Sequence, residues 1–355
     1  MTFTGRITTI TQNIILAKNY DNFFGDTSFI PYRFMGNGLE WSGGAALEIP
    51  ITIGKNTYGT SYSGMAKFTT GTLETRVKMS YDPRAYVIPV QIPGLEKAVN
   101  KGEAATLKLV TQEIKTTFES LLDDVSDMGY ADGTGNSNKN FLGLDALADD
   151  GTSAPTIATL SRTTYPTLAG VRTASGGTVT LDKLATFYMN LTSGSGQKNC
   201  PTVFVTDKTT WNYLEKLIVT GTVQANYTAN GYPVVNRRSK APVGGLAGEA
   251  GFKSILYKGT PIIFDGNATA QTLWGLNENY LQWYGLRSDD LKAITMDFLD
   301  GSANADAPSA DTGLQWSGFK DSFNQFGEVA YIHKLGNWIT PKPGTQGRLT
   351  GITGA

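Results

Sequence analysis

The feature that most constrains the fold is a long amphipathic stripe in the first half of the chain. Apolar side chains recur there at spacings of three and four residues: Leu107, Val110, Ile114, Phe118, Leu121, Val125 and Met128. Such spacing predicts one helix with a single apolar face. Asn100 and Glu103 resemble a capping box, and Gly129 is placed to end the helix, so its expected range is about 100–128. At a rise of about 1.5 Å per residue this helix would be about 40 Å long, and its narrow stripe indicates that it lies across a sheet.

A segment without aliphatic core residues separates two strand patterns before this helix. Residues 46–53 (ALEIPITI) and 73–81 (LETRVKMSY) are predicted strands, and residues 54–72 between them contain no Val, Ile or Leu. Loops of this length are uncommon inside compact domains and usually have a function. Because a hairpin with so little core is marginal in water, we expect it to lie on another surface.

The second half of the chain alternates helix and strand patterns. A helix is predicted at 181–191, a buried strand at 202–206 and a second helix at 207–218. Several short strand patterns follow between residues 254 and 286, and another at 326–335 precedes an extended tail.

Composition limits how this chain can interact with its surroundings. Charged residues make up 17% of the sequence, and 30 basic against 31 acidic residues leave a net charge of −1. A near-neutral chain has no overall field to recruit nucleic acid or a membrane surface. So little charge indicates that neighbouring molecules cover part of the outside. No run approaches about 18 apolar residues, so no membrane-spanning helix is predicted. The one cysteine, Cys200, cannot form an internal disulfide, which fits a reducing cytoplasm.

Residues for catalysis and metal binding are sparse. His333 is the only histidine, so zinc sites built on histidine and thiolate are excluded, and no G-x-S-x-G turn is present to seat a nucleophilic serine. Phosphate-loop and calcium-loop spacings are also missing. Paired carboxylates at 123–124, 149–150 and 289–290 leave a carboxylate-based hydrolase as the one enzymatic interpretation. We therefore expect no catalytic residues, no cofactor and no metal.

The order of these elements, together with several local phrases, resembles the major capsid protein of tailed bacteriophages. The phrases are FLGL after the long helix, PTVFVTDKTTWNYLEKL, KGTPIIFDGNA leading into LWGL, and VAYIHKLGNWITPKPG near the end. The resemblance covers essentially the whole chain and implies an α+β, HK97-like capsid fold. The parts that it implies are an N-terminal arm at 1–35, an E-loop β-hairpin with flanking strands at 36–91, a P-domain at 92–180 and 289–355 with the long helix as its spine, and an α/β A-domain at 181–288.

The same resemblance implies a structural function without enzymatic activity. Many copies, arranged as hexamers and pentamers, would form an icosahedral head around double-stranded DNA and touch that DNA without reading its sequence. The implied partners are a portal protein and separate scaffold or decoration proteins, with no membrane. Assembly would take place in the cytoplasm of the host bacterium, and the protein would end in the virion. Two alternatives stay open: an encapsulin, which is a cellular shell of the same fold around cargo enzymes, and, from another class, a carboxylate-based glycoside hydrolase.

Contacts between copies are expected at the loop of the hairpin. The candidate anchors are its large side chains, Tyr58, Tyr62, Met65 and Phe68. Ordering such a loop costs about 1–2 kcal/mol per residue in backbone entropy, which contacts with sister molecules can offset. One lineage of the family joins an E-loop lysine to an asparagine of a neighbour's P-domain. The corresponding candidates here are Lys55 and Lys67 for the lysine, and Asn324 and Asn337 for the asparagine.

A six-residue word occurs twice, as GLEWSG at 38–43 and as GLQWSG at 313–318. Nothing around either copy continues the similarity, so no domain is duplicated. We interpret Trp41 and Trp316 as apolar plugs at strand starts, near the base of the E-loop or at an interface. Coincidence is the alternative.

Overall fold

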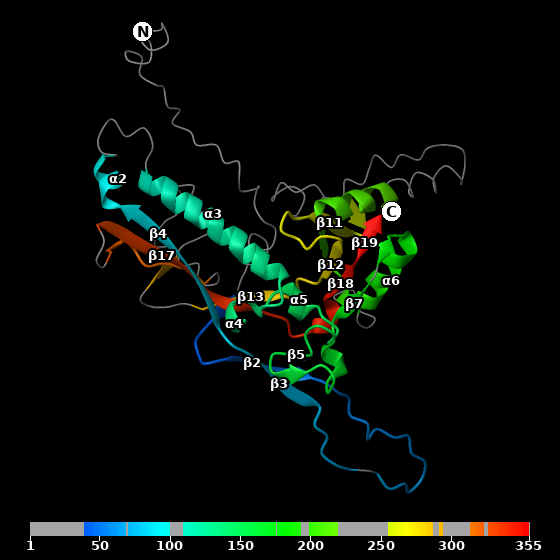
Figure 1. Cartoon of the computed structure of the whole chain (residues 1–355). Coiled ribbons are helices and arrows are strands. Elements are labelled where there is room, and N and C mark those ends of the chain that lie inside the picture. Colours follow the sequence, from blue (N-terminus) through cyan, green and yellow to red (C-terminus); the bar gives the residue numbers. More distant parts are fainter. Residues whose placement is uncertain are drawn as a thin grey trace, which may run out of the picture.

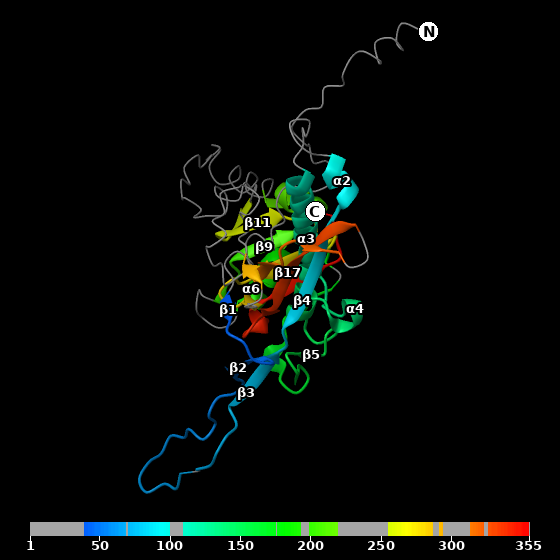
Figure 2. The same cartoon turned by 90° about the vertical axis from the view of Figure 1, so that its left-hand side faces the viewer.

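The computed structural model describes residues 39–68, 70–99, 109–174, 176–192, 199–218, 255–286, 291–293, 313–322 and 326–354. Over these residues the chain forms a seven-stranded sheet crossed by a long helix, and a six-stranded sheet with further helices beside it (Figure 1). A two-stranded hairpin carries a loop that projects away from this body (Figure 2).

The seven-stranded sheet is organised around β17, Gly327–Ile339. One edge of β17 pairs antiparallel with β4, Arg84–Pro93. Its other edge pairs in turn with three shorter strands, β13 (Gln282–Leu286), β15 (Leu314–Trp316) and β16 (Lys320–Asp321). Two outer strands complete the sheet, β1 (Leu39–Trp41) on β13 and β14 (Lys292–Ala293) on β15. A single long strand therefore holds together segments from both ends of the chain.

The long helix is α3, Leu109–Tyr130, and it packs along β4. Alternate side chains of β4 join the core cluster that α3 lines, among them Tyr86, Ile88 and Val90, whereas Val87 on the other face is exposed. The Tyr86 hydroxyl donates a hydrogen bond of 2.6 Å to Asp124 of α3. The helix thus lies across the sheet, as its narrow apolar stripe requires.

Within the stripe, the C-terminal residues are the most deeply packed. Phe118, Leu121, Val125 and Met128 are buried, and Val110 and Ile114 are half-buried. The helix continues to Tyr130, so Gly129 lies inside it and does not end it, contrary to expectation. The expected start of the helix, including Asn100, Glu103 and Leu107, lies outside the described residues.

The six-stranded sheet forms the other half of the body. Its strands, in order across the sheet, are β10 (Ile255–Tyr257), β11 (Thr260–Phe264), β9 (Val203–Thr206), β12 (Thr272–Leu276), β18 (Gly347–Thr350) and β7 (Val171–Thr173). The helix α6 (Leu181–Leu191) packs on it through Leu184, Phe187 and Leu191. A second helix at 208–218 contributes Leu214 to the same core cluster.

Two strands of this sheet come from segments outside 181–288. β7 and β18 fall in the two stretches expected to form the P-domain, yet β18 pairs with β12 and with β7. β19 (Ile352–Gly354), beyond β18, pairs with β8 (Gly177–Thr178). The expected extended tail is therefore a set of strands in the six-stranded sheet and beside it.

Short elements connect the two sheets and the hairpin. They are α2 (Gly94–Val99), α4 (Gly135–Asn138), α5 (Leu144–Leu147), β5 (Thr156–Ile157), β6 (Leu160–Ser161), and single 3-10 turns at Pro166–Leu168 and Pro343–Thr345.

The hairpin consists of β2, Leu47–Thr52, and β3, Arg76–Tyr81. Its base packs on the body, because Met79 and Tyr81 are buried in the larger core cluster. The described residues between the two strands have no helix or strand and are mostly exposed. The expectation that the hairpin lies on another surface therefore divides into two parts: the base lies on this molecule's own core, and the loop does not.

Candidate assembly surfaces

The loop between β2 and β3 presents its large side chains to solvent. Tyr62 is 66% exposed, Phe68 is 56% exposed, and Met65 is fully exposed. The rings of Tyr62 and Phe68 meet edge to face, with 5.0 Å between their centroids. We call these three residues the loop tip. Because exposed apolar side chains that gather in one place mark interaction sites, the loop tip is a candidate contact surface.

Tyr58 has a different position from the other expected anchors. It is half-buried, and its ring lies against Gly71 on the returning side of the loop, where a β-carbon would come within 2.8 Å of the Tyr58 hydroxyl oxygen. Its backbone N–H donates to the Asn56 side chain at 2.9 Å. Tyr58 thus spans the neck of the loop, whereas the loop tip lies beyond it.

The lysine and asparagine candidates for a covalent bond lie in contrasting environments. Lys55 and Lys67 are exposed on the loop. Asn337 is buried, where its Oδ1 accepts from the Leu142 N–H at 3.0 Å and its Nδ2 donates to the Asp82 carbonyl oxygen at 2.9 Å. An isopeptide bond at Asn337 releases Nδ2 as ammonia, so it would have to break the hydrogen bond from Nδ2 to Asp82, whereas Oδ1 stays as the carbonyl oxygen of the new amide. Asn324 lies outside the described residues.

Both copies of the repeated word lie in the seven-stranded sheet and meet Leu286, the last residue of β13. β1 pairs in parallel with β13, matching Leu39 to Tyr284 and Trp41 to Leu286. β15 also runs parallel to β13, because both are antiparallel to β17. The Gln315 side chain of β15 donates to the Leu286 carbonyl oxygen at 3.4 Å. Sequence inspection found the word but not this relationship, which only strand pairing reveals.

Each tryptophan of the repeated word is the last residue of its strand, not the first as expected. Trp41 is fully buried, and its Nε1 donates to the Gly43 carbonyl oxygen at 3.0 Å. Trp316 is half-buried against Phe319, with 5.4 Å between ring centroids. Trp41 therefore holds the start of the hairpin segment to the sheet, and Trp316 packs at the end of β15, where it is paired with Ile332 of β17.

Close backbone approaches between β13, β17 and the residue before β15 occur at glycines. Gly313, at the start of the second copy, has φ +65°, and a β-carbon there would overlap the Leu335 carbonyl oxygen. Gly336 has φ +142°, and a β-carbon there would overlap the Tyr284 carbonyl oxygen. Both β-carbons would also lie 3.1 Å from the Cα of Gly285. Three backbones approach here at a distance that leaves no room for side chains.

A second exposed apolar cluster lies at the end of β4 and β17. Leu95 and Val99 of α2 are 70% and 77% exposed, and Phe326, just before β17, is 82% exposed. We call these three residues the α2 patch. Sequence reasoning missed it, although the spacing of four between Leu95 and Val99 places both on one side of a helical turn.

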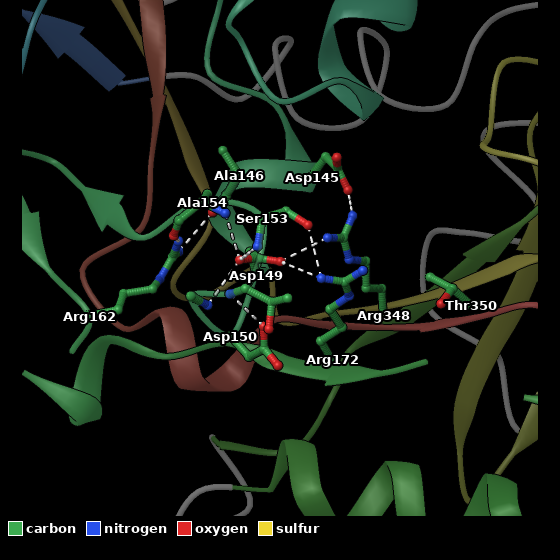
Figure 3. Close-up of polar contacts among 12 residues, drawn as sticks. Asp145, Ala146, Asp149, Asp150, Ser153, Ala154, Arg162, Arg172, Arg348 and Thr350 are labelled. Atoms are coloured by element: carbon green, nitrogen blue, oxygen red, sulfur yellow. Dashed lines mark hydrogen bonds and ion pairs between the residues drawn. The ribbon is translucent and has the colours of Figure 1, made fainter. Parts of the chain in front are cut away.

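A buried polar cluster centres on Asp149 (Figure 3). Its Oδ2 accepts from the backbone N–H groups of Gly151, Ser153 and Ala154 at 2.8–3.0 Å. Its Oδ1 accepts from Arg348 Nη2 at 2.8 Å and lies 3.7 Å from Arg172 Nη1.

The arginines around Asp149 are also committed to the fold. Arg348 forms a second ion pair with Asp145. Arg162 donates to the carbonyl oxygens of Ala154 at 2.6 Å and Ala146 at 2.7 Å. Burial lowers the pKa values of Arg162 and Arg348. The cluster ties the segment around 145–172 to β18 near the C-terminus, which is a structural role.

The paired carboxylates at 123–124 are also engaged. Asp124 accepts from Tyr86, and Asp123 accepts from the Asn267 side chain at 2.7 Å. Residues 289–290 lie outside the described residues. Burial, followed by the charges of Asp123, Asp124 and Asp265, raises the pKa of Asp127. In the described part of the chain, no group of three or more His, Cys, Asp or Glu side chains could hold a metal ion. No helix in those same residues is long and apolar enough to cross a membrane.

Comparisons with known proteins agree with the fold. No family model and no curated protein matches the sequence. The capsid asymmetric unit of Cyanophage A-1(L) is similar in structure, with a TM-score of 0.69 at 14% identity over 99% of this chain and 100% of that chain. The capsid of a native GTA particle matches with a TM-score of 0.56 at 9% identity, over 99% and 98%. An encapsulin, SrpI from Synechococcus elongatus PCC 7942, matches with a TM-score of 0.52 at 7% identity, over 99% and 96%.

Each similarity extends over nearly the full length of both chains, so it concerns the whole architecture and not one shared motif. The chain therefore has the α+β, HK97-like fold of these shell proteins, and the fold class expected from the sequence is confirmed. Function does not follow from fold alone and rests on the surfaces described above.

Proposed function

We propose that this chain is a major capsid protein of a tailed phage, and that many copies form an icosahedral shell around double-stranded DNA. The observation that carries the proposal is the exposed loop tip, on a fold that phage capsids share. The described part of the loop has few contacts with its own body, so a neighbouring subunit is the natural source of contacts for it.

The division of the hairpin into a packed base and a projecting loop suits this role. Tyr81 and Met79 keep the base in a defined position, so the loop leaves the body in one direction. Docking a loop whose attachment is already ordered costs less conformational entropy than docking a free segment. A subunit built in this way can contact several neighbours without a large change of its own core.

The remaining features of the proposal concern partners and location. The shell would consist of hexamers and pentamers, with a portal protein at one vertex and with separate scaffold or decoration proteins. A near-neutral chain would contact packaged DNA without sequence preference. The proposed function is structural and not enzymatic. Asp149 supports this proposal, because its carboxylate is buried and bound by backbone N–H groups of the fold. Assembly would take place in the host cytoplasm, and the protein would end in the virion.

An encapsulin is the second candidate, because the SrpI encapsulin shares the fold. Both candidates predict a closed shell, and they differ in its contents. Phage heads enclose a genome, whereas encapsulins enclose cargo proteins.

The test is to express the full chain and examine it by size-exclusion chromatography and negative-stain electron microscopy. We expect particles of megadalton mass. A species that stays monomeric at all concentrations, with hydrolytic activity toward glycosides, would overturn the proposal in favour of the hydrolase. Particles isolated from the native source should contain nuclease-sensitive double-stranded DNA. Cargo enzymes in place of DNA would establish the encapsulin.

A further inference from the structure

The turn between β5 and β6 has a backbone conformation that its residues disfavour. The two strands pair Ile157 with Leu160, so Ala158 and Thr159 form a two-residue turn. Their φ values are 47° and 70°. Turns with two positive φ values usually carry Asn-Gly, because a β-carbon crowds the backbone there, and a β-branched threonine is especially unfavourable. Such a turn persists only where its surroundings fix it, and strained backbone gathers at functional sites.

The carbonyl group of this turn contacts the outer edge of the projecting hairpin. The Ser80 N–H of β3 donates to the Ala158 carbonyl oxygen at 3.1 Å. Ser80 lies opposite Glu48 of β2, so its N–H points away from β2 and toward the turn. The Thr159 hydroxyl donates to the same oxygen at 2.6 Å. Both views show β5 beside β2 and β3, so the turn meets the hairpin at its base (Figures 1 and 2).

The turn is itself anchored in the body. Ile157 is buried in the larger core cluster. On the entering side, the Ala154 N–H donates to the buried Asp149 carboxylate at 2.8 Å. On the leaving side, Arg162 follows β6 and donates to the carbonyl oxygens of Ala154 at 2.6 Å and Ala146 at 2.7 Å. The Asp149 cluster therefore fixes both sides of the β5–β6 hairpin, and the turn of that hairpin contacts β3.

We propose that the β5–β6 turn is a brace that sets the direction in which the projecting hairpin leaves the body. Ala158 is its positioning residue, because its carbonyl oxygen acts through Ser80 on the loop beyond. The unfavourable φ values follow from directing this carbonyl group at β3. In the proposed shell, a loop held in one direction meets its neighbour with less loss of conformational freedom. The inference rests on that function for its purpose, whereas the brace itself can be tested in the single subunit.

The test compares two versions of the turn that differ in the direction of the carbonyl group. Ala158→Asn with Thr159→Gly favours a type I′ turn, which keeps both positive φ values; we call this the type I′ variant. Ala158→Gly with Thr159→Asn favours a type II′ turn, whose central peptide is flipped; we call this the type II′ variant. Both are ordinary hairpin turns of the same composition, so only the type II′ variant should lose the bond from Ser80.

Two spin labels measure the direction of the hairpin. In a Cys200→Ser background, Thr52→Cys places one label at the end of β2 toward the loop, and Met189→Cys places the other on α6. Both positions are exposed. Pulsed electron–electron double resonance on dissociated subunits gives the distribution of distances between the labels. We expect a narrow distribution from the parent turn and from the type I′ variant, and a wider one from the type II′ variant.

Substitutions on β3 give an independent comparison. Ser80→Pro removes the N–H that reaches the turn, and proline is tolerated on the outer edge of a strand. Lys78→Pro is the matched control, because it lies two residues away on β3, where the N–H also points away from β2. Ser80→Pro should widen the distribution of distances, and Lys78→Pro should not.

A hydrogen bond that only adds stability would lower the unfolding midpoint in urea without changing the distribution of distances. That result for the type II′ variant and for Ser80→Pro would overturn the inference, as would equal widening by Lys78→Pro.

Particle yield tests the connection with assembly. The yield should fall in the type II′ variant and stay normal in the type I′ variant. Normal yields from both would overturn the role of the brace in assembly and leave the shell function standing. A parent chain that forms no particles would remove the shell function, while the spin-label distances would still decide whether the turn sets the direction of the hairpin.

Discussion

The hydroxyl group of Tyr81, at the end of the hairpin, donates a hydrogen bond of 2.9 Å to the carbonyl oxygen of Thr340, 259 residues further along the chain. The same hydroxyl accepts from the Thr340 N–H at 3.4 Å. Burial raises the pKa of Tyr81 above its usual value, so the hydroxyl stays protonated and can donate throughout the neutral range. The base of the hairpin is thereby joined to the segment that follows β17.

Tyr81→Phe should destabilise the subunit and leave the loop unaltered. The change leaves buried backbone groups of Thr340 without their partner, which costs about 1–3 kcal/mol. Urea unfolding of dissociated subunits measures the loss. Tyr331→Phe, at an exposed position on β17, is the control and should change stability by less than about 0.5 kcal/mol. Equal effects of the two changes would show that the Tyr81 hydrogen bond does not hold the hairpin.

Replacing Tyr62, Met65 and Phe68 together by Ser should abolish assembly without unfolding the subunit. These side chains are exposed in the single chain, so they contribute little to its core. Circular dichroism should be unchanged, while the megadalton peak in size-exclusion chromatography is replaced by a subunit peak. A matched control replaces Val87, Met189 and Leu256, three exposed apolar residues away from the loop, and should still assemble. Particles in normal yield from the loop variant would refute a role for the loop tip.

Asp149→Asn should be strongly destabilising, and Asp150→Asn should not. Asp149 is fully buried and faces Arg348 and Arg172, so removing its charge takes one of two carboxylates from the buried Arg348 and the nearest carboxylate from the half-buried Arg172. Losing one partner of a buried ion pair costs about 3–5 kcal/mol. Asp150 is exposed and accepts from the Thr152 N–H at 2.9 Å. Thermal unfolding of the two variants measures the difference, and similar melting temperatures would contradict the structural role assigned to Asp149.

Stability should rise with pH between about 7 and 10 because of Lys334. This side chain is buried with its Nζ 4.6 Å from the centroid of the Trp283 ring, and burial lowers its pKa to about 7. Above that pH the unfolded chain still binds a proton that the folded chain has released, so raising the pH favours the folded state. The slope cannot exceed about 1.4 kcal/mol per pH unit for one group.

The variant Lys334→Met should remove this pH dependence, because methionine has no proton to release. Urea unfolding at pH 7, 8 and 9 measures the slope for both chains. Lys78→Met is the control, since Lys78 is exposed in an ion pair with Glu48 and should leave the slope unchanged. The same slope in the Lys334→Met chain would show that another group titrates in this range.

Much of the fold could be predicted where neighbouring residues decide the structure. The spacing from Val110 to Met128 predicts α3 because a helical turn brings residues three and four apart onto one face. The helix at 181–191 and the strand of β9 follow from the same local rules. The absence of Val, Ile and Leu from 54–72 correctly indicates a loop without a core of its own.

The candidate surfaces were predicted only in part. Tyr62, Met65 and Phe68 could be named because they are the large apolar side chains of a long polar loop. The α2 patch could not, since its Phe326 lies 231 residues beyond Leu95 and joins it only through the pairing of β4 with β17.

By itself, the sequence determined the long helix, the helix at 181–191, strand β9 and the loop at 54–72, since those elements depend on contacts within a few residues. Only the tertiary structure decided that β18 joins β12 and β7, that Asp149 meets Arg348, and that both copies of the repeated word meet Leu286 of β13. These arrangements depend on strand register and on charges brought together from distant segments. No spacing along the chain specifies them, because their partners are chosen by the packing of the whole core.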